Sequence, residues 1–264
     1  MRKQKRLTVT ALLAALCVLL AAGCGQQESG MELSVCVGGS YSTLDPIYAE
    51  DIPSQTVLVH LYENLMRVVA DQAGNSNVVN GMAKSVETEK NADGTVTCRF
   101  QLRSAKWSDG EKVTAEDFVY AWQRLADPDS HSPYAALLSV VCGYQEARLA
   151  KDMSLLQVSA PSDTMFEVTL TGNLRAGFLR EVCTSPATLP LRQDVVQRLK
   201  EAGSADGEAA SWWQDPTALV TMVLMWRRTL AEGSYLRRCL PGLRLAYGIQ
   251  SRVSPAGSGL SICL

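Results

Sequence analysis

The residue types that carry most enzyme and metal chemistry are sparse in this 264-residue chain. It contains two histidines, His60 and His131, and eight cysteines, none of which forms a Cys-x-x-Cys pair. This spacing provides no metal-ligand set. A Gly-x-Ser-x-Gly elbow, a His-Glu-x-x-His helix and a glycine-rich phosphate loop are also missing from the sequence. We therefore expect no catalytic residues, no cofactor and no metal.

Asp109 and Glu116 are the acids most easily taken for an acid/base pair. Asp109 belongs to a Trp-Ser-Asp-Gly turn, in which its carboxylate accepts backbone N–H groups. Glu116 falls in the first turn of a predicted helix, where the helix dipole favours an acid. Each residue has a structural role, so we assign neither of them to acid/base chemistry.

The N-terminus has the pattern of an export signal. Four basic residues fall within the first six, and an uncharged stretch follows from Leu7 to Ala22. The next segment, Leu20-Ala21-Ala22-Gly23-Cys24, resembles the lipobox of bacterial lipoproteins, in which the cysteine sulfur takes a diacylglyceryl group. We expect a signal peptide at 1–23 and a flexible tether at 24–32, with the lipid on Cys24. An ordinary cleavage site beside an incidental cysteine is the alternative.

These expectations place the protein outside the cytoplasm, lipid-anchored to the outer face of the cytoplasmic membrane or in the periplasm. An exported protein can hold a disulfide, and the sequence does not choose the pair. Four cysteines of the body are open to it: Cys36, Cys98, Cys142 and Cys183. Cys98 lies on the apolar side of an alternating strand, which predicts a core position.

The net charge of −2 conceals three regions. Residues 1–23 sum to +4, residues 222–264 carry six arginines and one acid and sum to +5, and the body between them sums to −11. An acidic exported body argues against nucleic acid as a partner. A hydrophobic content of 47% gives enough apolar side chains for one large or two small folded domains.

Alternation of apolar and polar residues predicts strands. The strongest case is 95–103, where every second residue is apolar: Val96, Cys98, Phe100 and Leu102. A similar pattern at Phe166, Val168 and Leu170 predicts another strand, a short strand is expected at 33–37, and 71–77 is expected to be a loop.

Apolar residues at helical spacing predict helices over 54–66 and about 192–202. Between these two, the sequence predicts a third helix. Thr114 has the character of its N-cap, and Asp127-Pro128 is expected to end it. The helical pattern there and the turn before it predict core positions for Trp107 and Trp122. Interspersed helices and strands indicate an α/β or mixed α+β fold.

Several motifs in register resemble the family 5 extracellular solute-binding proteins, which are peptide- and nickel-binding components of bacterial ABC importers. They are Leu44-Asp45-Pro46, Leu61-Tyr62-Glu63-Asn64-Leu65, Phe100-Gln101-Leu102-Arg103, Lys106-Trp107-Ser108-Asp109-Gly110, Val113 to Trp122, Ser132-Pro133-Tyr134 and Phe166 to Leu170. The resemblance implies a class II periplasmic-binding fold. Within it, 33–60 begin the first lobe, 61–190 form an attached subdomain, and 191–221 return to the first lobe.

The resemblance also implies the function, which is extracytoplasmic peptide binding for uptake through a membrane permease by a monomer. By position, the ligand contacts would be Glu50, Asp51, Ile52 and Tyr134. A core role for Tyr134 and a merely solvated Glu50 remain open. A peptide-signal receptor or adhesion lipoprotein on the same fold is the alternative function, with nickel or haem binding and a secreted hydrolase behind it.

The resemblance stops at Thr221. Family members typically continue Asn-Gly-Pro-Tyr or Asn-Gly-Pro-Phe, whereas this chain has Met222-Val223-Leu224-Met225-Trp226. One permitted set of codons for this run reads Asn-Gly-Pro-Tyr-Val after a shift of one base. We hypothesise a frameshift near Thr221, so that 222–264 is a poorly ordered out-of-frame tail, the second lobe is missing and peptide binding is impaired. A basic nucleic-acid or membrane patch and a divergent C-terminal domain are the alternatives.

Overall fold

The computed structural model describes most of the chain between residues 40 and 205. The described residues are 32–35, 40–172, 177–205, 222–223, 253–254, 257–258 and 260–263. The chain divides into two units, Met1–Glu32 and Leu33–Leu264, and the elements below belong almost entirely to the second. The predicted signal peptide, Cys24 and most of the predicted tether and tail lie outside the described residues.

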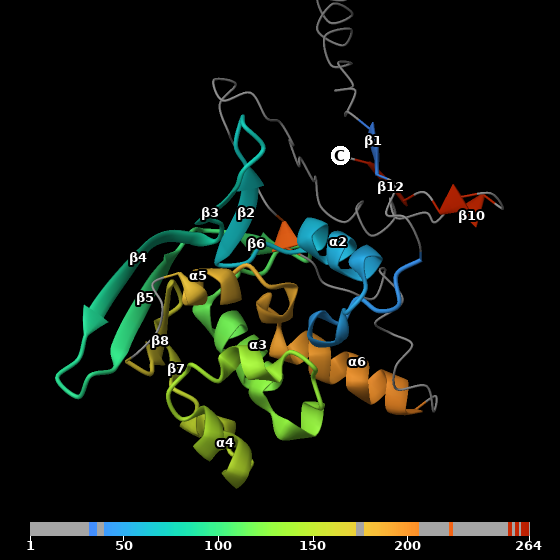
Figure 1. Cartoon of the computed structure of the whole chain (residues 1–264). Coiled ribbons are helices and arrows are strands. Elements are labelled where there is room, and N and C mark those ends of the chain that lie inside the picture. The colour runs from blue at the N-terminus through green and yellow to red at the C-terminus, as the bar shows by residue number, and fades with distance from the viewer. Residues whose placement is uncertain are drawn as a thin grey trace, which may run out of the picture. The chain divides into compact units, whose positions relative to one another are not determined.

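A four-stranded antiparallel sheet forms one side of the described region, with helices packed beside it (Figure 1). In spatial order its strands are β4 (Ala83–Lys90), β5 (Val96–Leu102), β8 (Met165–Leu170) and β7 (Val158–Ser162). The register places Phe100 of β5 opposite Val86 of β4 on one side and Phe166 of β8 on the other. Strands β5 and β8 confirm the two strands that alternation predicts.

One face of this sheet is buried against α3 (Ala115–Ala126). The buried apolar side chains of the two central strands are Cys98, Phe100 and Leu102 from β5, with Phe166, Val168 and Leu170 from β8. The ring centroids of Phe118 and Trp122, both on α3, lie 5.9 and 5.1 Å from that of Phe166. Such aromatic pairs contribute about 0.5–1.5 kcal/mol each beyond the area that they bury. Trp122 is fully buried, which confirms its predicted core position.

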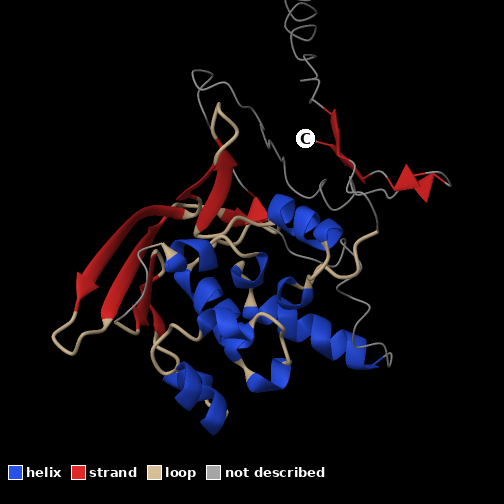
Figure 2. Cartoon of the chain, viewed as in Figure 1, coloured by secondary structure: helices blue, strands red, loops and turns tan. Residues whose placement is uncertain are grey.

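The opposite face of the sheet is polar. Arg99 of β5 donates from Nε to Glu167 at 2.6 Å and from Nη1 to Glu89 at 2.7 Å. These three residues belong to adjacent strands, so the ion pairs cross the sheet. An antiparallel sheet with one core face and one polar face, covered by helices on the core side, is a mixed α and β architecture, as predicted (Figure 2).

The start and end of α3 follow the predicted signals. The backbone N–H of Thr114 donates to Asp117 Oδ2 at 2.7 Å, which forms one half of a capping box. The helix ends at Ala126, just before Asp127 and Pro128, as predicted. The indole N–H of Trp107 also donates to Asp117 Oδ2, at 3.2 Å, and the buried Trp107 confirms its predicted core position.

The predicted helix 54–66 corresponds to α2 (Ile52–Leu61), and its predicted C-terminal end is wrong. Tyr62 has extended backbone angles, because the following residues are held by tertiary contacts. The Asn64 amide donates to the Ser185 carbonyl at 2.8 Å. The apolar residue Leu65, which continues the helical spacing, is buried just before β2 (Met66–Ala70) rather than on a helix.

The remaining elements are mostly short. They are β1 (Glu32–Val35), η1 (Pro46–Tyr48), β3 (Ser76–Asn80), β6 (Lys106–Trp107), η2 (Pro128–Ser130), η3 (Ala135–Leu138), α4 (Tyr144–Ala150), η4 (Met153–Leu155), α5 (Phe178–Val182), η5 (Pro186–Thr188), α6 (Gln193–Ala205), β9 (Met222–Val223), β10 (Val253–Ser254), β11 (Gly257–Ser258) and β12 (Leu260–Cys263). The predicted loop 71–77 joins β2 to β3 but ends sooner, because β3 begins at Ser76. Over the described part of the chain, no helix is long and apolar enough to cross a membrane.

Cys98, Cys142 and Cys183 are free thiols. Cys98 and Cys183 are buried and Cys142 is half-buried, while Cys36 lies outside the described residues. The position of Cys98 confirms its predicted place in the core. Burial raises the pKa of the Cys98 and Cys183 thiols, so neither is a ready nucleophile at neutral pH.

Candidate functional site

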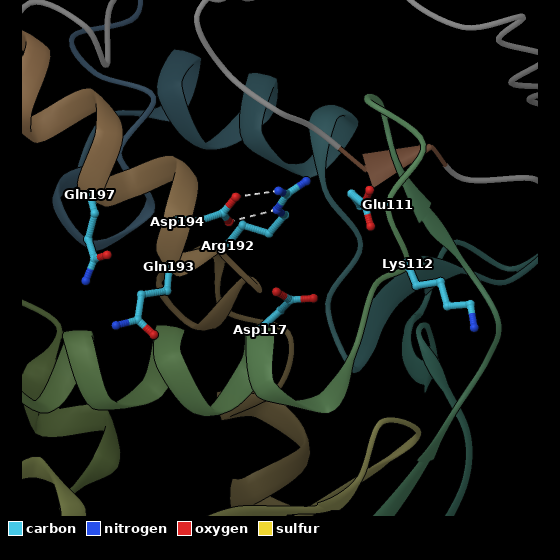
Figure 3. A pocket seen from close by; sticks show the side chains of 7 residues that line it. All are labelled: Glu111, Lys112, Asp117, Arg192, Gln193, Asp194 and Gln197. Atoms are coloured by element: carbon cyan, nitrogen blue, oxygen red, sulfur yellow. Dashed lines mark hydrogen bonds and ion pairs between the residues drawn. The ribbon is translucent and has the colours of Figure 1, made fainter.

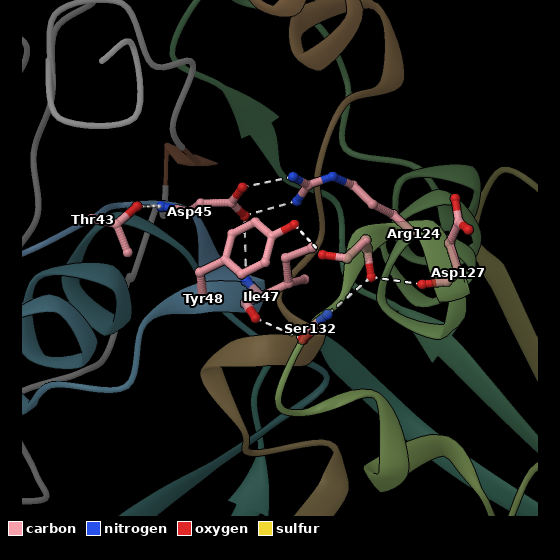
Figure 4. Close-up of polar contacts among 8 residues, drawn as sticks. Thr43, Asp45, Ile47, Tyr48, Arg124, Asp127 and Ser132 are labelled. Carbon is pink, nitrogen blue, oxygen red and sulfur yellow. Dashed lines mark hydrogen bonds and ion pairs between the residues drawn. The ribbon is translucent and has the colours of Figure 1, made fainter. Parts of the chain in front are cut away.

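The Leu44-Asp45-Pro46 turn is held by a residue of α3 far along the chain. The buried Asp45 accepts from the backbone N–H of Ile47 at 3.3 Å. Arg124 donates from Nη1 to Asp45 Oδ1 at 2.8 Å and from Nη2 to Oδ2 at 2.6 Å (Figure 4). The side chains of Arg124 and Asp45 are 10% and 2% exposed. This two-bond geometry fixes the turn against α3.

The electrostatics around Arg124 favour its charged form. Burial lowers the pKa of Arg124, but the hydrogen bonds and charge of Asp45 outweigh this, and the pKa is raised above its ordinary value. Burial and the carboxylate of Asp45 also raise the pKa of Tyr48. Tyr48 therefore stays a neutral hydroxyl donor, and Arg124 stays a cation.

The segment after the turn is tied to residues 127–134. The Ser132 hydroxyl donates to the Ile47 carbonyl at 2.7 Å, and the Tyr48 hydroxyl donates to the Ser130 carbonyl. Figure 4 shows both contacts spanning the two segments. Side chains from each segment therefore bond to the backbone of the other.

Tyr134 makes the next contact along the same segment. Its hydroxyl donates to the Ala49 carbonyl at 3.1 Å and accepts from Gln55 Nε2 at 3.3 Å. Gln55 Nε2 also donates to the Ala49 carbonyl, at 2.9 Å. The Tyr134 ring is half-buried against the core. Tyr134 thus packs on the core and bonds to the predicted ligand loop.

The other three predicted ligand contacts follow Ala49 directly. Glu50 is exposed, and Ile52 is 76% exposed. Asp51 caps α2, because it accepts from the backbone N–H of Ser54 at 2.7 Å and from the Ser54 hydroxyl at 2.6 Å. The fold therefore brings all four predicted residues together and leaves Glu50 and Ile52 open to solvent, while the Asp51 carboxylate is occupied.

The hydrogen bonds to the Asp51 carboxylate lower its pKa. Partial burial raises it, but hydrogen bonds from Ser42 and Ser54 outweigh burial and lower the pKa to about 2. Asp51 is consequently a full anion at neutral pH, engaged by two hydroxyls and a backbone N–H.

An open pocket of about 610 Å³ lies beside α3 and α6 (Figure 3). Its lining residues are Glu111, Lys112, Asp117, Arg192, Gln193, Asp194 and Gln197. Arg192 donates from Nε to Asp194 at 2.9 Å and also pairs with Asp109. Burial raises the pKa of Asp117, against the hydrogen bonds from Thr114 and Trp107 that lower it. The arginine of this pocket is matched by Asp109 and Asp194, so its charge is already compensated within the protein.

The two acids excluded from acid/base chemistry have the structural roles expected of them. Asp109 Oδ1 accepts the backbone N–H of Glu111 at 3.2 Å in the turn, and Glu116 lies exposed in the first turn of α3. Across the described residues, no group of three or more histidine, cysteine or acidic side chains could hold a metal ion.

Sequence reasoning missed three parts of this site, namely the partner of Asp45 and the roles of Ser132 and Gln55. A signal existed for the first. Asp45 stands between Leu44 and Ile47, both fully buried, and an acid within an apolar turn requires a cationic partner. The pattern does not identify Arg124 as that partner, because the two residues lie on separate elements.

Comparison with known proteins identifies the family. Residues 77–221 match the profile of the bacterial extracellular solute-binding proteins, family 5 middle region. A dipeptide-binding protein of Lactococcus lactis is 33% identical over 201 residues, covering 74% of this chain and 34% of that protein. The periplasmic oligopeptide-binding protein OppA of Salmonella typhimurium is 31% identical over 227 residues, covering 83% of this chain and 38% of OppA. The chain thus spans about a third of the length of the curated relatives that it matches.

Solved structures agree. The OppA of Haemophilus influenzae, in complex with the peptide RPPGFSPFR, matches 64% of this chain and 32% of its own, with 35% identity and a TM-score of 0.54. An oligopeptide transporter's substrate-binding domain from Bacillus anthracis matches 71% and 33% at 25% identity, with a TM-score of 0.59. The family consists of binding proteins rather than enzymes. The match confirms the predicted family and the prediction that the protein is not an enzyme. With more than half of its length inside the family profile, the chain belongs to the bacterial extracellular solute-binding proteins, family 5.

Proposed function

We propose that this chain carries part of the peptide-binding site of an extracytoplasmic ABC importer component. One observation carries the proposal: Glu50 and Ile52 project from a segment that Tyr134 and Gln55 hold in place. The relatives named as dipeptide- and oligopeptide-binding proteins support a peptide as the ligand.

The chemistry of the segment suits a peptide. An extended peptide offers backbone N–H donors and one terminal ammonium group, and the exposed Glu50 carboxylate can accept from either. Ile52 offers apolar surface beside it. Recognition through the main chain gives affinity without reading the side chains, which suits a component that accepts varied peptides.

The location and partners follow from the same proposal. Cys24 would carry the lipid that holds the protein at the outer face of the cytoplasmic membrane. From there the protein would pass its ligand to a membrane permease. Peptide and permease are the partners proposed, with no nucleic acid.

We also propose that residues 222–264 are the product of a frameshift near Thr221. The family match reaches residue 221, and the tail carries six arginines, one acid and no lysine. Residues 222–264 would then not supply the family sequence that follows residue 221. A cleft needs both walls to bury a ligand, so the peptide affinity of the chain as it stands would be low.

The test is a calorimetric titration of a mixed peptide pool against two proteins. The first is residues 25–264, and the second is the product of the gene with its frame restored at Thr221. We expect binding only by the second protein. Tight, saturable binding by residues 25–264 would refute the impairment, and no binding by the frame-restored protein would refute peptide binding itself. A single clean frame in the sequenced locus would refute the frameshift.

A second function is favoured by one solved neighbour. The pheromone receptor PrgZ matches 71% of this chain at 26% identity, with a TM-score of 0.58. A peptide-signal receptor on the same fold would bind one defined peptide. A titration in which one peptide sequence binds and a mixed pool does not would favour this reading over nutrient uptake, and so would a locus without a permease gene.

A further inference from the structure

We propose that Tyr134, Ser132 and Gln55 are positioning residues, which hold residues 47–52 in the geometry that a peptide meets. The inference rests on the proposed function, and it gives Tyr134 a supporting role beside the predicted ligand contact.

The Tyr134 hydroxyl is engaged by the segment that it supports. A phenol has one O–H to donate, and that of Tyr134 goes to the Ala49 carbonyl. The same oxygen already accepts from Gln55 Nε2. A ligand group that accepted a hydrogen bond from this hydroxyl would have to displace the Ala49 carbonyl.

The Ala49 carbonyl receives two hydrogen bonds from these residues. A carbonyl oxygen has two lone pairs, and this one accepts from both Gln55 at 2.9 Å and Tyr134 at 3.1 Å. Its acceptor capacity is therefore used from within the protein. The backbone at Ala49 is fixed on the side from which these two donors reach it.

Ser132 extends the same arrangement along the segment. Its hydroxyl donates to the Ile47 carbonyl at 2.7 Å and accepts from the backbone N–H of Tyr134 at 3.2 Å. One hydroxyl thus links the backbone of Tyr134 to the backbone of the segment. The Ser-Pro-Tyr motif acts on the segment through both of its polar side chains.

Both ends of the segment are also fixed. Asp45, at one end, is bound by Arg124. Asp51, at the other, accepts from Ser54, and the backbone N–H of Ser42 donates to Ser54 Oγ at 3.0 Å. What stays open between the fixed ends is Glu50, next to the exposed Ile52. A segment ordered in advance loses less conformational freedom when it binds, so positioning contributes to affinity without contact.

The test is hydrogen exchange with mass spectrometry on the whole chain without peptide. The variants are Tyr134→Phe and Ser132→Ala, with Tyr144→Phe on α4 as the matched control. Each of the two variants should accelerate exchange of backbone amides in residues 47–55 on the order of fivefold, the factor expected for the loss of one hydrogen bond. Exchange in β5 should stay at the wild-type rate, and the control should change neither region.

Three results would overturn the proposal. Unchanged exchange in residues 47–55 would show that these hydroxyls do not order the segment. Equal acceleration in residues 47–55 and β5 would show a loss of global stability instead. The third uses the frame-restored protein: loss of peptide binding in Tyr134→Phe with unchanged exchange would make Tyr134 a direct ligand contact. If the frame-restored wild type bound no peptide, the proposed function would fail, while the exchange experiment would still decide the positioning.

Discussion

Arg124 and Asp45 are 79 positions apart in the chain and are joined by two hydrogen bonds of 2.8 and 2.6 Å. Their pairing ties the turn that precedes the candidate ligand loop to the helix that covers the core face of the sheet. The position and orientation of the loop are therefore set by a helix that packs on the buried face of the sheet.

Substitution Arg124→Met should lower the free energy of unfolding by about 3–5 kcal/mol, the usual cost of leaving one buried charge without its partner. Urea denaturation followed by tryptophan fluorescence measures this. Lys151→Met is the matched control, because the Lys151–Asp129 pair is an exposed ion pair with both side chains 64% exposed. The control should show no measurable change, and a similar small effect of Arg124→Met would contradict the importance of the buried pair.

Gly143 provides a prediction about close backbone packing. It has a φ of +78°, and a Cβ added there would lie 1.9 Å from the Leu155 carbonyl oxygen. Gly74 has a φ of +85°, but a Cβ there would meet nothing within 4 Å. Gly74→Ala should therefore cost only the backbone strain, about 1–2 kcal/mol, and Gly143→Ala should cost clearly more in the same denaturation assay. Equal losses would show that the loop at Leu155 moves aside freely.

Local pattern was enough to predict the parts of the fold whose residues decide their own conformation. The alternation at β5 and β8, the Thr114 start and the Pro128 stop of α3 all depend on neighbours within a few residues. The helix over 54–66 failed at its end because Asn64 bonds to Ser185, a contact that no local pattern contains. Leu65 fits the helical spacing and is nevertheless buried beside a strand.

The candidate site divides in the same way. Glu50, Asp51, Ile52 and Tyr134 were named by their resemblance to family motifs, and the fold places them together. Asp51 could have been recognised as a helix cap from the proline and serine that follow it. Gln55 has no such signal, because its value depends on the position of the Ala49 carbonyl relative to Tyr134. Resemblance finds positions, whereas the distinction between contact and support requires the hydrogen bonds.

Asp51 gives a prediction about pH. Its folded-state pKa of about 2 lies below the ordinary value of 3.8, so its stabilising effect is present above pH 4 and is lost as the pH falls towards 2. Asp51→Ala should cost about 1 kcal/mol at pH 7, the usual value of a lost N-cap, and the difference from wild type should shrink by pH 2.5. Asp51→Asn is the control, because it caps a helix without titrating in this range. A wild-type advantage that is constant from pH 7 to 2.5 would contradict the assigned cause.

The lipid anchor is testable in cells. If Cys24 carries the lipid, the protein should be found in the membrane fraction and should incorporate radiolabelled palmitate. Cys24→Ser should abolish the labelling and release the protein from the membrane fraction into the wash. Cys17→Ser, in the predicted signal peptide, is the matched control and should leave labelling intact. Labelling that survives Cys24→Ser would place the anchor elsewhere.

Glu50 supplies the prediction that bears most directly on function. Its carboxylate is exposed, and in the described structure no hydrogen bond or ion pair engages it, so Glu50→Ala should leave the melting temperature unchanged. In the frame-restored protein the same change should weaken peptide binding about tenfold, which corresponds to about 1.4 kcal/mol and is near the lower end for a hydrogen bond to a charged group. Glu87→Ala, an exposed acid on β4, removes the same charge far from the loop and serves as the control. Equal weakening by the two variants would mean that peptides respond to the overall charge of the body, and raising the salt concentration should then abolish both effects together.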